Sequence, residues 1–295
     1  MNKAHNLALC ACALGAAACT PAASNFDQAD TTPDAGLPRE ADGRKAELLS
    51  AFFGLDNALP MVANRICLGG NGYDGMPVIF STEVDHETLQ AGDFAVITEA
   101  GVSGTVHCVS LLPATDPGEL RTALLIGEFG DADKDPPAEV AIIGHVTSID
   151  GTLDFKGARV AVTPLADGPG LVLAEPVSDE VTDEGLSLAG TDGSDCPADG
   201  TAQAIRAVWG GGVSLPSGED VGDTQRLLYS VTVETADGDR REVQPFALAD
   251  HDDPDNNHVL CLDTADTAVA VSFPAGVFVD PNDDLNPATN LSVTR

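Results

Sequence analysis

Basic residues, recognisable catalytic motifs and long apolar runs are all scarce in this 295-residue sequence. It holds 14 lysine and arginine residues against 47 aspartate and glutamate residues, and its formal net charge is −33. A surface this negative repels phosphate backbones, so the composition argues against a nucleic-acid partner. Cations and basic protein patches are the partners it attracts, although the same acidity also serves simply to keep a protein soluble.

Motifs for a catalytic nucleophile or a nucleotide are missing as well. The sequence contains no G-x-S-x-G elbow, no H-E-x-x-H pair and no P-loop. Residues 70–75 match the letters of G-x-G-x-x-G, but Met76-Pro77 and an apolar stretch follow where the dinucleotide motif needs a helix. We therefore predict a turn at 70–75 and a protein that is not an enzyme.

The longest apolar run lies at the start of the chain. Residues 6–18 follow Lys3 and end in three alanines, which is the layout of a secretory signal peptide. Thirteen residues are too few to span a bilayer as a helix, which takes about 20. We predict that residues 1–18 are a signal peptide and that the protein is exported.

Ala16-Ala17-Ala18-Cys19 resembles the lipobox of bacterial lipoproteins. The resemblance implies that Cys19 receives the lipid, becomes the new N-terminus and holds the protein on a membrane of the cell envelope, either the outer membrane or the cell surface. Cys12 fits the same pattern less well, and a plain signal peptide cut near Ala18 or Ala23 is a further alternative.

Four cysteines remain beyond the lipobox, namely Cys67, Cys108, Cys196 and Cys261. An even number in an oxidising compartment predicts two disulfides, with three possible connectivities. Pairing Cys67 with Cys108 and Cys196 with Cys261 is favoured because it places one bridge in each half of the chain. A structural zinc site is a poor alternative, since no C-x-x-C pair follows Cys19.

Composition divides the rest of the chain into four parts. Residues 19–43 are rich in Ala, Pro, Thr and Asp and predict a disordered tether, whereas the acidic residues 178–195 predict a linker. Between and after them lie two all-β domains, 44–177 and 196–295, in which short apolar runs are punctuated by Gly, Pro and Asp. Residues 44–55 predict one short helix, because four apolar side chains recur at helical spacing.

Two stretches carry a family resemblance. Residues 77–101, PVIFSTEVDHETLQAGDFAVITEAG, resemble the opening of bacterial immunoglobulin-like domains in surface-layer and adhesin proteins. Residues 278–284, FVDPNDD, resemble the close of such domains, although the glycine of that pattern is missing. The resemblance implies two immunoglobulin-like β-sandwich domains that act as spacer, display or binding units, with no catalytic residues to transfer.

Three loops place oxygen ligands at alternate positions, which is a pattern that suits the hard cation Ca²⁺. They are centred on residues 131–135, 253–257 and 280–284, and none has the glycine or the terminal glutamate of an EF-hand. The candidate calcium ligands are Asp250, Asp253, Asp255, Asn257, Asp280, Asn282 and Asp284. The alternative is that these are solvated acidic loops between strands.

Two histidines and the single tryptophan are further candidates for a binding site. His251 and His258 flank the acidic loop and suit a transition metal, but two loop histidines exposed to water are favoured. Trp209, followed by three glycines, is either a core anchor or a flat docking platform, and the core is favoured.

Taken together, the sequence predicts an envelope protein that binds or displays non-enzymatically, with a protein or glycan partner at the cell surface and with bound Ca²⁺. Two alternatives stay open. One is a secreted hydrolase whose site lies around His251, Asp253 and His258, since catalytic triads are recognised by geometry rather than spacing. The other is a structural spacer without a ligand.

Overall fold

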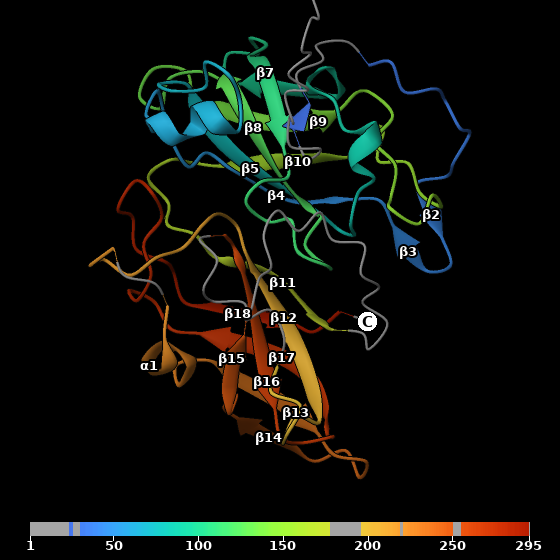
Figure 1. The fold of residues 1–295 in the computed structure, drawn as a ribbon, viewed down its shortest axis with the longest axis vertical. Helices are drawn as coiled ribbons and strands as arrows, with labels where there is room; N and C mark the ends of the chain where they lie inside the picture. The colour runs from blue at the N-terminus through green and yellow to red at the C-terminus, as the bar shows by residue number, and fades with distance from the viewer. Residues whose placement is uncertain (1–23, 26–29, 178–195, 219–220, 250–254, 295) are drawn as a thin grey trace, which may run out of the picture.

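The computed structural model describes residues 24–25, 30–177, 196–218, 221–249 and 255–294 (Figure 1). Strands dominate these residues, which confirms the prediction of an all-β protein. The predicted signal peptide, the lipidation site Cys19 and the predicted linker 178–195 lie outside the described residues. So do Asp250, His251 and Asp253 of the acidic loop.

The strands are β1 (Ser24–Asn25), β2 (Glu40–Ala41), β3 (Arg44–Lys45), β4 (Leu48–Phe52), β5 (Asp74–Phe80), β6 (Phe94–Thr98), β7 (Thr105–Ser110), β8 (Thr122–Glu128), β9 (Pro137–Ile142), β10 (Arg159–Thr163), β11 (Leu171–Pro176), β12 (Gln203–Trp209), β13 (Ser230–Glu234), β14 (Arg240–Val243), β15 (Ala247–Ala249), β16 (Asn257–Leu262), β17 (Thr267–Phe273) and β18 (Thr289–Ser292). The helical turns are the 3₁₀ helices η1 (Met61–Arg65), η2 (His86–Thr88) and η3 (Ala91–Asp93) and the α-helix α1 (Asp223–Arg226).

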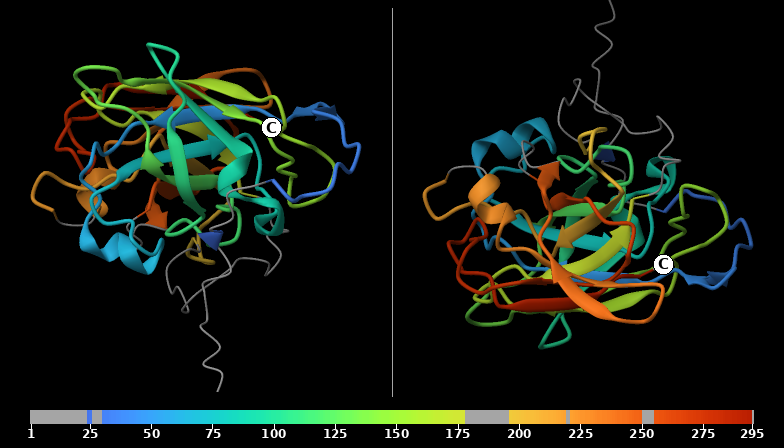
Figure 2. Two further views of the ribbon diagram at one scale, coloured as in Figure 1. Left: turned by 90° about the horizontal axis from the view of Figure 1, so that it is seen from above. Right: turned by 90° about the horizontal axis from the view of Figure 1, so that it is seen from below.

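An eight-stranded sheet forms the first layer, in the order β1-β7-β8-β5-β4-β10-β9-β6. Its pairs are antiparallel apart from β4 and β10, which run parallel. The sheet curves until its far side returns to β7, since the Gly104 amide donates to the Val96 carbonyl at 2.8 Å. Figure 2, seen from above, shows this curvature around the core. Apolar side chains fill the concave side, among them Phe53, Phe80, Phe129 and Phe155.

Two four-stranded sheets form the second and third layers, β11-β12-β16-β15 and β14-β13-β17-β18. One buried core joins them, with Trp209, Tyr229, Phe273 and Phe278 at its centre. Trp209 packs edge-on against Phe273 and Phe278, each at 5.2 Å between ring centroids. The tryptophan is therefore a core anchor, as the sequence favoured.

The middle sheet, β11-β12-β16-β15, is buried on both faces, and every residue of β16 is buried. One face of β16 belongs to the core around Trp209 through Leu260 and Leu262. Its opposite face carries Val259 and Cys261 in a separate cluster. Burial on both sides explains why residues 259–262 of this strand are continuously apolar instead of alternating.

The first layer packs on the middle sheet through a small apolar cluster and two ion pairs. Ile79 of β5 meets Leu173 and Val208 in the cluster. Arg206 of β12 forms a buried ion pair with Glu119 at 2.6 Å, and Arg121 pairs with Glu175 of β11 at 2.6 Å. β11 lies within the predicted segment 44–177, yet it pairs with β12.

The predicted short helix at 44–55 is wrong, because β4 occupies its centre. β4 lies between β5 and β10, and both of its faces are covered. Leu48 and Phe53 face the core of the first layer, whereas Leu49 faces the middle sheet. Paired apolar residues on both faces of a strand imitate the spacing of an apolar helix face, and the tertiary pairing overrides the local preference.

Described residues of the predicted tether 19–43 contact the first layer. Gln90 holds Thr31 and Thr32 through hydrogen bonds of 2.7–3.1 Å, and the Asp154 amide donates to the Pro38 carbonyl at 3.0 Å. Polar side chains and backbone groups make these contacts, so an apolar pattern does not reveal them.

Candidate functional site

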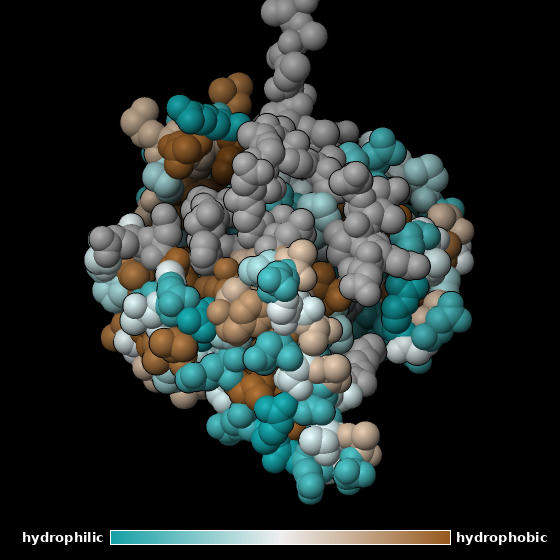
Figure 3. Space-filling model, turned by 60° about the horizontal axis from the view of Figure 1, so that its bottom comes forward, coloured by the Kyte–Doolittle hydropathy of each residue, from teal (hydrophilic) through white to brown (hydrophobic). Residues whose placement is uncertain are grey.

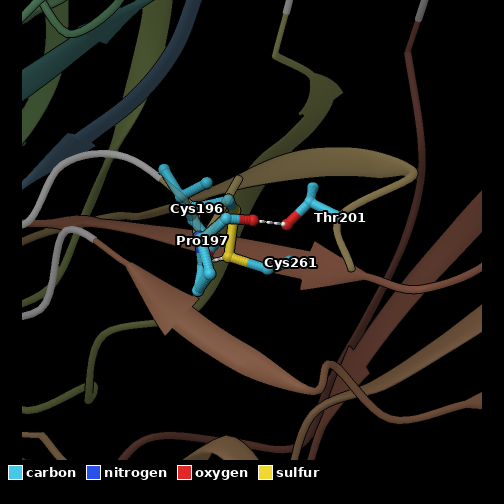
Figure 4. Close-up of a disulfide and its surroundings, with 5 residues drawn as sticks. Cys196, Pro197, Thr201 and Cys261 are labelled. Carbon is cyan, nitrogen blue, oxygen red and sulfur yellow. Dashed lines mark hydrogen bonds between the residues drawn. A yellow bond between two sulfur atoms is a disulfide. The ribbon is translucent and has the colours of Figure 1, made fainter. Parts of the chain in front are cut away.

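The predicted bridge between Cys196 and Cys261 is confirmed, with a distance of 5.6 Å between the Cα atoms (Figure 4). It fixes the segment before β12 to β16. The Thr201 hydroxyl donates to the Pro197 carbonyl at 2.6 Å and closes the turn beside it. The bridge is an anchor for the start of the second half of the chain.

The predicted bridge between Cys67 and Cys108 is not formed in this structure. Both residues are free thiols, both are buried, and a side-chain hydrogen bond joins them. The sequence therefore predicted correctly that these two cysteines lie together. In the structure they meet as thiols and not as a disulfide.

The loop 280–284 places its carboxylates as backbone acceptors. Asp280 Oδ1 accepts from the amides of Asn282 and Asp284 at 3.0 and 2.9 Å. Asn282 Nδ2 donates to Asp284 Oδ2 at 2.7 Å. The other oxygen, Asp280 Oδ2, is buried and has no hydrogen-bond partner among the described residues, and burial raises the pKa of this carboxyl.

Asp255 and Asn257 are buried at the start of β16. Asp255 Oδ1 accepts from the Asn257 amide at 2.7 Å, and the neighbouring Asn256 Nδ2 donates to the Trp209 carbonyl at 2.7 Å. Within the part of the chain that the structure describes, no group of three or more His, Cys, Asp or Glu side chains is arranged to hold a metal ion. The third acidic loop acts as a turn, since Asp131 Oδ1 accepts from the amides of Asp133 and Lys134.

His258 is buried in the core, so the interpretation of an exposed loop histidine is wrong for it. Trp209 Nε1 donates to Tyr229 Oη at 3.0 Å, and Tyr229 Oη lies 2.6 Å from His258 Nδ1. His258 occupies the core side of β16 because residues alternate along the strand with Leu260 and Leu262. This histidine is part of the aromatic core rather than of a surface metal or hydrolase site.

A cavity of about 260 Å³ lies between the first layer and the loops of the middle sheet. Its walls are almost entirely apolar, and the middle sheet contributes Gly211, Gly212, Asp255 and Asn256. The side chains lining it from the first layer include Phe52, Leu59, Val62, Ile66, Leu112, Pro113 and Leu124. Because Pro281 also lines it, the described residues Asp255 and Asn256 of one acidic loop and Pro281 of the other border one space.

The surface around this cavity carries several exposed apolar residues. Met61, Val62 and Leu68, on or beside η1, are 76%, 55% and 88% exposed. On the face drawn in Figure 3, brown hydrophobic residues lie among teal hydrophilic ones. Single apolar residues on a surface are ordinary, so the cavity carries more information about binding than these residues do.

A titratable cluster under η3 was not found from the sequence. Burial raises the pKa of Asp93 to about 7, and the negative charges of Asp30 and Asp154 add to this shift. His145 Nδ1 lies 2.6 Å from Asp154 Oδ2, and Lys156 Nζ lies 2.9 Å from His145 Nε2. Asp30, Asp93 and the 145–156 segment are far apart in the chain, so only the fold reveals the cluster.

The chain matches no protein-family model, and no curated protein matches it in sequence. Among the helices that the structure describes, none has the length and apolar character needed to cross a membrane.

Proposed function

We propose that this is an exported, lipid-anchored envelope protein whose folded part binds a ligand without catalysis. The signal layout and Ala16-Ala17-Ala18-Cys19 support export and lipidation. The binding role is supported by one observation, the apolar cavity between the first layer and the middle sheet. Apolar pockets at the junction of two packed units are the usual place for small-molecule sites.

The cavity favours an uncharged or cationic apolar ligand. Asp255 and Asn256, two of its polar members, already hydrogen-bond to Asn257 and to the Trp209 carbonyl. The third, Thr122, has a buried hydroxyl without a hydrogen-bond partner among the described residues, so it offers a ligand one polar contact. A closed apolar cavity of roughly 150 Å³ is large enough to bind benzene, and the volume of this open one, about 260 Å³, is larger. The net charge of −33 disfavours an anionic ligand.

Binding is tested with an uncharged naphthylamine dye whose fluorescence rises in an apolar site. We expect saturable binding to the full chain and its loss in Gly212→Leu. A Cβ at Gly212 has only the Asp255 carbonyl oxygen near it, at 3.8 Å, so the larger side chain enters the cavity without a backbone clash.

The matched control is Gly222→Leu, where the position is equally open and lies outside the cavity lining. Equal dye binding by both variants and the parent chain, or no saturable binding at all, would reject the cavity as the site.

Lipidation is tested by metabolic labelling with an alkyne fatty acid. We expect Cys19→Ala to lose the label and Cys12→Ala to keep it. Label that persists in Cys19→Ala, or that never appears in the parent chain, contradicts the assignment.

We also propose that Ca²⁺ binds beside Asp280. The supporting observation is the buried oxygen Asp280 Oδ2, which has no hydrogen-bond partner among the described residues. A buried carboxylate oxygen without a partner is costly, and a cation offsets that cost. Millimolar Ca²⁺ should raise the Tm relative to chelator, and Asp280→Asn should abolish the rise; an unchanged Tm in the parent chain contradicts calcium binding.

We also propose that the chain forms two immunoglobulin-like β-sandwich domains, at 44–177 and 196–295. The two sheets around Trp209 support it for the second segment. Cleavage between 178 and 195 tests the division. Because β11 pairs with β12, we expect the two fragments to stay associated until denaturant is added.

A further inference from the structure

Cys67 and Cys108 come from different parts of the first layer and meet in a small apolar cluster. Cys67 follows η1, and its amide donates to the Ala63 carbonyl at 2.8 Å. Cys108 lies in the middle of β7, which pairs with β8. Leu59, Ala63 and Ile126 complete the cluster around the two sulfur atoms.

The two thiols differ in acidity because of their mutual hydrogen bond. Donation from Cys108 lowers the pKa of Cys67, and the same bond together with burial raises the pKa of Cys108. A thiolate is the nucleophile in thiol–disulfide exchange. Cys67 is thus the attacking sulfur, and Cys108 is the resolving one.

The segment that carries Cys67 lies at the surface, whereas the strand that carries Cys108 is internal. Met61 and Leu68 on either side of Cys67 are largely exposed, and the Gly70 amide returns to the Cys67 carbonyl at 2.8 Å. A short surface turn of this kind opens more readily than a strand within a sheet, and opening gives a small disulfide access to Cys67.

We propose that Cys67 and Cys108 form an oxidisable pair that closes to a second disulfide by exchange with a low-molecular-weight disulfide. The Cys67 thiolate attacks one sulfur of the small disulfide, whose S–S bond breaks and releases one thiolate. Cys108 then gives its proton to solvent, attacks Cys67 Sγ and expels the second thiolate. The protein loses two hydrogen atoms, and the small disulfide becomes two thiols.

Closure ties η1 to β7. Because Val62, Ala63 and Ile66 line the apolar cavity, closure also fixes one of its walls, and this last consequence rests on the proposed function. The thiol chemistry itself does not depend on whether a ligand binds.

The experiment incubates the full chain, with its Cys196–Cys261 bridge intact, with glutathione disulfide, then unfolds and alkylates it for peptide mapping. We expect a linked peptide pair containing Cys67 and Cys108 and a mass lower by two hydrogen atoms. Cys108→Ala should instead retain glutathione on Cys67, and Cys67→Ala should retain none on Cys108. Alkylation of both residues in the treated parent chain overturns the proposal.

A second measurement reads the structural effect. Amide exchange over residues 61–70 should slow by about tenfold or more in the oxidised chain, with exchange in β13 unchanged. Equal exchange in the two forms would reject the tie between η1 and β7. If the mapped bridge forms while the naphthylamine dye binds neither form, the proposed binding function fails and the thiol assignment stands.

Discussion

The ion pair between Arg206 and Glu119 gives the sharpest test of how the layers are joined. Arg206 lies on β12 of the middle sheet, and Glu119 lies just before β8 of the first layer. Their side chains are 6% and 1% exposed, and Arg206 also donates to the Pro117 carbonyl at 3.0 Å. Removing one partner strands a buried charge, which costs about 3–5 kcal/mol. Arg206→Met should therefore lower the free energy of unfolding by about that amount.

The double variant separates the pair from its surroundings. Because apolar replacement of both partners removes both desolvation costs, Arg206→Met with Glu119→Leu should be clearly more stable than either single variant. The matched control is the exposed pair of Arg240 and Glu234, where Arg240→Met should cost less than about 1 kcal/mol.

The assay is urea unfolding followed by fluorescence of the single tryptophan, Trp209, and by far-ultraviolet circular dichroism. Trp209 reports on the second and third layers, whereas circular dichroism reports on all strands. We expect coincident transitions, because the buried pair couples the layers. A loss below 1 kcal/mol in Arg206→Met, together with separate transitions, would refute the reasoning.

Three further outcomes follow from the structure. The raised pKa of Asp93, about 7 in the fold against 3.8 as its ordinary value, means that the native state holds a proton that the unfolded chain has lost between these pH values. Stability should therefore fall by up to about 4 kcal/mol as the pH rises from 4 through 7, and Asp93→Asn should flatten this part of the urea-midpoint profile where the exposed Asp237→Asn does not. Replacing both Cys196 and Cys261 with serine opens a loop of 65 residues and should cost about 4 kcal/mol in the same unfolding assay; a cost under 1 kcal/mol would contradict the bridge. Gly127→Ala brings a Cβ within 2.0 Å of the Thr105 carbonyl oxygen and should lower the Tm by several degrees, whereas Gly212→Ala, with 3.8 Å to its nearest neighbour, should not.

Strand positions were predictable because short apolar runs between glycine, proline and aspartate are a local signal. The pairing of those strands was not. β4 joins β5 and the distant β10, and the second of these contacts is parallel, which no local pattern encodes. The helix predicted at 44–55 was wrong for the same reason. Two different layers bury the two faces of β4, and the resulting apolar pattern resembles that of one helix face.

The site divides in the same way. The even number of cysteines predicted two disulfides, and placing one in each half of the chain chose the partners. Only Cys196 and Cys261 are bridged in the structure, whereas Cys67 and Cys108 meet as thiols. Alternate carboxylates in the acidic loops predicted calcium, and in the structure Asp131 Oδ1 and Asp280 Oδ1 accept backbone amides. Carboxylates at alternate positions suit both a turn, in which they accept hydrogen bonds from nearby backbone amides, and a cation site. The sequence pattern alone therefore does not distinguish the two.

The cavity owes its existence to the glycines after Trp209. The tryptophan side chain enters the core between the second and third layers, and the glycines that follow it approach Ser50, Phe52 and Pro77 of the first layer. A Cβ at Gly211 would lie 2.8 Å from Phe52 Cδ1, so only glycine allows this close approach without a shift of the ring. At Gly212 there is open space instead, and no side chain fills it. The side chain that anchors the core and the open part of the cavity wall thus come from four consecutive residues, 209–212. A larger residue at position 212 should therefore fill the cavity without disturbing the core around Trp209.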